Sequence, residues 1–145
     1  MTHLDLLELT AGGPVLLYDG ECGVCNRTVG WFLAHESSES QVRFAALESE
    51  LGRALRAEAK VPAHIESVLW IEQRGTRVVA LDRSSAILRL AQETASPWKH
   101  LAWLRLIPSA LRDFCYERFA AIRHRVVAPA CFVPAPTQRV RFLSE

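Results

Sequence analysis

The chain has no run of about 18 apolar residues, the length that a membrane-spanning helix needs. Its first residues, Met1 to Glu8, lack the basic segment, apolar core and small-residue cleavage site of a secretory signal. Acidic and basic residues nearly balance, 16 against 17, so the basic surplus of a nucleic-acid-binding protein is absent too. We therefore expect a cytoplasmic protein that neither spans a membrane nor binds nucleic acid.

Internal repeats and low-complexity segments are also absent, and cysteines number only four. Cytoplasmic cysteines usually stay reduced, so four of them indicate redox chemistry or metal binding before a structural disulfide framework. Half of the 145 residues are hydrophobic, which is enough for one core without stabilisation by disulfides or metal ions. We expect a single domain over 1–145, with a core over about 14–95, a helical extension over about 96–127 and an irregular tail over 128–145.

Periodicity and turn residues divide the chain into alternating strands and helices. Strands are predicted over 14–18, 42–46, 66–72 and 77–80, and helices over 23–35, 48–60, 82–93, from 96 onward and over 108–127. The helix between the first two strands predicts a parallel pair, and the short link before the fourth strand predicts an antiparallel hairpin. This β-α-β-α-β-β-α order resembles the thioredoxin fold, so we expect an α/β protein with a mixed four-stranded sheet and additional C-terminal helices.

The motif Cys22-Gly23-Val24-Cys25 falls where the first predicted strand gives way to the first predicted helix. Cys22 then lies at the amino end of that helix, where free backbone N–H groups and the helix dipole favour a thiolate. Cys25 follows one turn later on the same face. This placement predicts a two-step exchange, in which Cys22 attacks a disulfide and Cys25 resolves the mixed disulfide.

Two other interpretations of the motif remain open: a zinc half-site, or two reduced cysteines without chemistry. The remaining pair, Cys115 and Cys131, lacks the close spacing of zinc ligands, and the five histidines form no ligand pattern, so we expect no metal and no cofactor. Cys115 is expected to lie in the core, and Cys131 is a candidate third redox thiol.

The segment from Tyr18 to Asn26 resembles the D-G-x-C-x-x-C signature of the DCC-type thiol-disulfide oxidoreductases, with Asp19, Cys22 and Cys25 in the signature positions. The resemblance extends to later positions of the chain: Ala86-Ile87, Tyr116, Ala120, Arg123, Cys131 and Arg141-Phe142. Ile122 departs from the family pattern, which has asparagine there. The resemblance implies a thiol-disulfide oxidoreductase that acts on a disulfide-containing protein or a small thiol and is served by an unidentified electron donor.

Asp19 has two interpretations. Its place just before the motif suggests a proton acceptor for Cys25, whereas Asp-Gly is also a common turn sequence. A carboxylate beside Cys22 would oppose the thiolate, so we do not expect Asp19 to activate Cys22 directly.

Thioredoxin-like enzymes usually carry a cis-proline before the third strand, and here the nearest proline is Pro62. Either Glu66 or Ser67 takes its place opposite the cysteines, or the strand begins elsewhere.

The C-terminal region carries apolar and basic side chains in close succession. An apolar helix is expected to cover the sheet or to form a partner surface, through Trp98, Leu101, Trp103, Leu104 and Leu106. The last helix is basic, through Arg112, Arg118, Arg123 and Arg125, and a solvated face is the ordinary interpretation. A thioredoxin-like binding module with incidental cysteines is the alternative to the enzyme.

Overall fold

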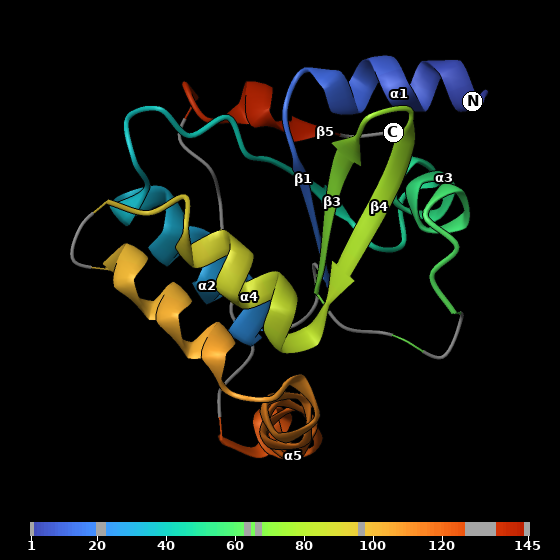
Figure 1. The fold of residues 1–145 in the computed structure, drawn as a ribbon. Helices are drawn as coiled ribbons and strands as arrows, with labels where there is room; N and C mark the ends of the chain where they lie inside the picture. The colour runs from blue at the N-terminus through green and yellow to red at the C-terminus, as the bar shows by residue number, and fades with distance from the viewer. Residues whose placement is uncertain are drawn as a thin grey trace.

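The computed structural model describes residues 2–19, 23–62, 65, 68–95, 98–126 and 136–143 (Figure 1). Its centre is a mixed five-stranded sheet with the strand order β4-β3-β1-β2-β5. Strand β1 (Val15–Tyr18) pairs in parallel with β2 (Arg43–Ala46) and antiparallel with β3 (Leu69–Arg74), which forms a hairpin with β4 (Arg77–Asp82). Both predicted pairings are therefore confirmed. The third strand, however, begins at Leu69 and not at residue 66.

Helices cover both faces of the sheet, and the strands alternate between two cores. On one face α2 (Gly23–His35) and α4 (Arg83–Ala91) pack over Leu16, Phe44 and Trp70. On the other face α1 (His3–Ala11) and α3 (Glu50–Glu58) pack over Val15, Leu17, Leu69 and Ile71. Neighbouring residues of one strand thus enter opposite cores, as the two-residue period of a strand requires.

Two elements were not predicted. Helix α1 begins at a capping box, in which the Asp5 backbone N–H donates to Thr2 Oγ1 and the Thr2 backbone N–H donates to Asp5 Oδ2. Within the tail, the 3₁₀ turn η2 (Arg139–Arg141) leads into β5 (Phe142–Leu143), which pairs in parallel with β2. The predictions of four strands and of a tail that is irregular throughout are therefore wrong.

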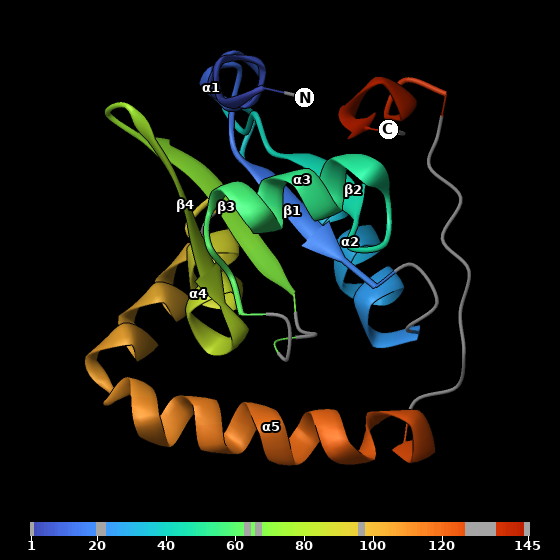
Figure 2. The same ribbon diagram turned by 90° about the vertical axis from the view of Figure 1, so that its right-hand side faces the viewer.

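Of the two C-terminal helices, the apolar one was expected to cover the sheet or to form a partner surface, and its main contacts are with α4. The segment η1 (Trp98–Leu106) is a 3₁₀ helix that packs on α4, and Trp103 is 69% exposed. Helix α5 (Ser109–Val126) also packs on α4 and passes beneath the sheet, at the end where α2 begins (Figure 2). Arg83 joins the two helices, since its guanidinium lies 2.7 Å from Glu117 Oε1 and 3.5 Å from Asp113 Oδ2.

Strand β5 is held to the domain by side chains at its amino end. The Arg141 guanidinium donates to both carboxylate oxygens of Glu36, at 2.5 and 2.6 Å, and its Nε donates to the Val42 carbonyl at 2.9 Å. The next residue, Phe142, stacks on Phe44 with ring centroids 5.0 Å apart. These contacts bridge about a hundred residues of sequence and replace the long hydrogen-bonded ladder that a two-residue strand cannot form.

We expect Arg141→Ala to lower the free energy of unfolding by about 2 kcal/mol, because a bidentate, partly buried Arg–Glu pair and a backbone hydrogen bond are lost together. The measurement is urea unfolding, compared at constant m-value. Arg139→Ala is the control, since Arg139 is an exposed arginine two residues away. Equal midpoints for the two variants would show that the Arg141–Glu36 pair contributes nothing.

Candidate active site

The cysteine motif spans the junction predicted for it. Strand β1 ends at Tyr18 and α2 begins at Gly23, so the strand-to-helix transition falls within the motif's own segment. Cys22 itself lies outside the described residues, as do Gly20 and Glu21. The first turn of α2 contains Cys25, whose side chain is only 3% exposed.

Cys25 lies at the boundary between the core and a cavity. On one side it packs in the core cluster that contains Val29, Phe32 and Trp70. On the other side it lines a cavity of about 250 Å³, together with side chains from α2, α4, α5 and the segment before β3: Thr28, Val68, Ile87, Tyr116, Phe119 and Ala120. A molecule in this cavity would therefore be in contact with the buried thiol.

Asp19 lies between the end of β1 and the motif and is half-buried. The residue before it, Tyr18, packs against the same core cluster as Cys25. Burial raises the pKa of the Tyr18 phenol, so this hydroxyl stays protonated at neutral pH. The position of Asp19 agrees with either interpretation, turn residue or proton acceptor.

In the segment before β3, the structure places one residue beside Cys25. Glu66 and Ser67, the expected substitutes for a cis-proline, lie outside the described residues. The residue that directly precedes the strand, Val68, is buried and contributes an apolar wall to the cavity beside Cys25. No sequence signal had marked Val68.

Three positions of the family resemblance meet at this cavity. Ile87, Tyr116 and Ala120 carried no role in the sequence pattern, and the structure places all three on the cavity wall. Thr28 and Phe119 complete the wall without having been predicted. Each lies three residues after another wall residue of the same helix, Thr28 after Cys25 and Phe119 after Tyr116, so each pair shares one helix face.

Of the other two cysteines, the structure describes Cys115. Cys115 was expected in the core, but it is exposed on α5, and this prediction is wrong. The side chain lines a second cavity, to which α4 and η1 also contribute side chains. Cys131 lies outside the described residues.

Two kinds of feature are absent from the part of the chain that the structure describes. Nowhere in that part do three His, Cys, Asp or Glu side chains gather as a potential metal site. None of its helices is both long and apolar enough to cross a membrane.

Comparison with known proteins gives a family and two relatives. The family model described as DCC1-like thiol-disulfide oxidoreductase matches residues 16–128. A DCC family protein of Arabidopsis thaliana, named as chloroplastic, is 34% identical over 113 residues, which are 77% of this chain and 63% of that protein. The uncharacterized protein YuxK of Bacillus subtilis (strain 168) is 27% identical over 132 residues, 89% of this chain and 93% of YuxK. The chain thus spans less than two thirds of the plant relative's length, and no solved structure matches.

Proposed function

The chain belongs to the DCC1-like thiol-disulfide oxidoreductase family, and from this premise we propose that it reduces disulfides through Cys22 and Cys25. The observation that carries the proposal is the buried Cys25 in the first turn of α2, three residues after Cys22 and beside a cavity. Because the motif follows a strand and enters a helix, it lies at the amino end of that helix. In this proposal Cys22 is the nucleophile and Cys25 is the resolving thiol.

In the first step, the Cys22 thiolate attacks one sulfur of a client disulfide. The client S–S bond breaks, a mixed disulfide forms, and the second client sulfur leaves as a thiolate that takes a proton from water. Cys22 comes one residue before α2, and the free N–H groups and positive dipole at the start of a helix favour the thiolate there.

In the second step, Cys25 loses its proton and attacks the Cys22 sulfur. The mixed disulfide breaks, the remaining client sulfur leaves as a thiol, and a Cys22–Cys25 disulfide remains. Two electrons have then passed to the client, and a dithiol donor must return them. The 3% exposure of Cys25 supports this division of roles, because a bulky disulfide cannot reach that sulfur first.

Asp19 is the proposed proton acceptor for Cys25. A carboxylate that is half-buried directly after β1 lies in the segment that leads to the motif, and proton removal from a buried thiol requires a nearby base. Cys25 is the group that has to lose a proton during the cycle, whereas Cys22 is already ionised when it attacks.

We propose that residues of about 14–95 form a thioredoxin-like core. The strand order β4-β3-β1-β2, with β1 and β2 parallel and β3 and β4 antiparallel, supports this assignment. Helix α1, the segment from η1 to α5, and β5 are then additions to the core. A reducing compartment such as the cytoplasm suits a protein that must recover its dithiol.

Thiol mapping tests the proposed function. Iodoacetamide should label Cys22 before Cys25 in the reduced protein, and mild oxidation should produce a disulfide between the two, seen by peptide mass mapping. An oxidised sample in which both thiols remain free for alkylation would overturn the proposal.

A further inference from the structure

The cavity beside Cys25 has an apolar chemistry that limits what it can bind. Its described wall consists of aliphatic and aromatic side chains with the hydroxyls of Thr28 and Tyr116, and it includes no charged side chain. A volume of about 250 Å³ is smaller than a typical ligand pocket of roughly 300–1,000 Å³. The space suits one large apolar side chain better than a whole cofactor.

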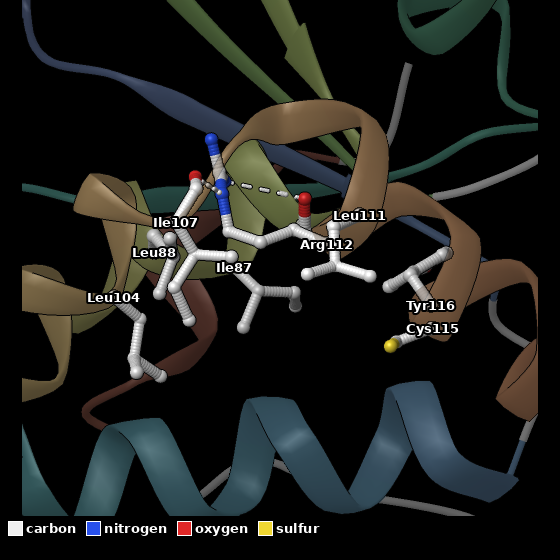
Figure 3. Close-up of a pocket in the computed structure, with 9 residues that line it drawn as sticks. Ile87, Leu88, Leu104, Ile107, Leu111, Arg112, Cys115 and Tyr116 are labelled. Atoms are coloured by element: carbon white, nitrogen blue, oxygen red, sulfur yellow. Dashed lines mark hydrogen bonds between the residues drawn. The ribbon is translucent and has the colours of Figure 1, made fainter.

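A second cavity, of about 360 Å³, is lined by side chains that Figure 3 draws. The two cavities share Ile87 and Tyr116 as lining residues. Apolar side chains from η1, α4 and α5 make up most of the second wall, and Figure 3 shows those of Leu104 and Leu111 on opposite sides of it. Together the cavities form what we call the α5 cleft, with Cys25 at one end.

The residues that line the second cavity include two polar side chains, Arg112 and Ser84, which are hydrogen-bonded to each other. Arg112 Nε donates to the Ile107 carbonyl at 3.0 Å, and Arg112 Nη1 donates to Ser84 Oγ at 3.3 Å. Arg112 is the one charged side chain among the described residues that line either cavity. A ligand with carboxylates on both sides of its disulfide, such as glutathione disulfide, therefore meets no cation among the described side chains that line the cavity at Cys25.

We propose that the α5 cleft binds an extended segment of a client protein, and that a large apolar side chain beside the client disulfide enters the cavity at Cys25. The inference rests on the proposed function and names its substrate class. Two observations favour a protein segment over a small disulfide. Cys25, the proposed resolving cysteine, lines the first cavity. The second cavity shares Ile87 and Tyr116 with it and adds about 360 Å³ of largely apolar space, which suits further residues of an extended chain.

Phe119 is the residue of α5 that most directly tests this assignment. It is 43% exposed and lines the cavity at Cys25. A client side chain that packs against the Phe119 ring would remove apolar surface of both partners from water, which favours binding in proportion to the buried area. Phe119 is thus a specificity-determining residue for the proposed reaction.

The test compares two cyclic peptide disulfides that differ at one position next to a cysteine, Phe in one and Ser in the other. We expect kcat/KM to be roughly tenfold higher for the Phe peptide, the size of effect that one apolar contact produces. Glutathione disulfide should be reduced more slowly than the Phe peptide. Phe119→Ala should reduce the preference for Phe to about twofold or less.

Phe114→Ala is the matched control. Phe114 lies on the same helix, is 54% exposed and packs against the Arg118 guanidinium, and it lines neither cavity. Its removal should leave the preference unchanged. Equal rates for the two peptides, or equal effects of Phe114→Ala and Phe119→Ala, would overturn the α5 cleft as the client site and leave the proposed function intact. Failure of the wild type to reduce any of the three disulfides would overturn the proposed function itself.

Discussion

Cys22→Ser is expected to abolish disulfide reduction, lowering kcat/KM by at least about a thousandfold, because the residue removed is the proposed nucleophile. A serine hydroxyl is not ionised at neutral pH and cannot form the mixed disulfide. The measurement is the reduction of a peptide disulfide with a dithiol donor in excess. Urea unfolding of the same variant should show a midpoint close to that of the wild type, which separates lost chemistry from lost folding.

Cys25→Ser completes the comparison with a different expected result. Here Cys22 still attacks, but nothing within the protein resolves the product, so the mixed disulfide with the client should accumulate and be visible as a mass adduct. A Cys22→Ser variant with the wild-type rate would contradict the proposed roles. It would favour a thioredoxin-like binding module whose cysteines are incidental.

The largest expected effect on stability belongs to Trp70→Ala. Trp70 is fully buried in β3, between the sheet and the helices α2 and α4, and its indole N–H donates to Glu72 at 2.9 Å. Replacement leaves a cavity in the core and should lower the free energy of unfolding by about 3–5 kcal/mol. Denaturant unfolding, followed by circular dichroism, measures the change.

Trp103→Ala is the control for Trp70→Ala, because the substitution is the same and the environment is opposite. Trp103 is 69% exposed on η1. Its replacement should change stability by less than about 0.5 kcal/mol. A loss for Trp103→Ala comparable to that for Trp70→Ala would mean that η1 is packed far more closely than its exposure indicates.

The elements of the central sheet could be predicted because their signals are local. Apolar runs, turn residues and helix-forming segments marked β1 to β4 and α2 to α4, and most helix boundaries differ from the prediction by two residues or fewer. Helix α1 also has a local signal, the capping box formed by Thr2 and Asp5. Strand β5 carried none, because its support comes from Glu36 and Phe44, about a hundred residues away.

The cysteine motif was predictable and the cavity beside it was not. A C-x-x-C at a strand-to-helix junction is a pattern within one segment, whereas the cavity wall combines α2, α4 and α5. Tyr116 and Ala120 are separated from Cys25 by about ninety residues, and only the family resemblance drew attention to them. The exposure of Cys115 was missed for a related reason: an apolar helix was expected to face the core, whereas α5 packs mainly on α4 and leaves Cys115 exposed.

Strand β5 has one more consequence. The family match ends at residue 128, so β5 lies outside it, yet β5 pairs with β2 and covers what would otherwise be an open edge of the sheet. Unpaired strand edges template pairing between molecules. A chain that ended at residue 128 would keep both motif cysteines and leave the hydrogen-bonding groups of Phe44 and Ala45 that face β5 unpaired. Its expected defect is aggregation during expression and storage.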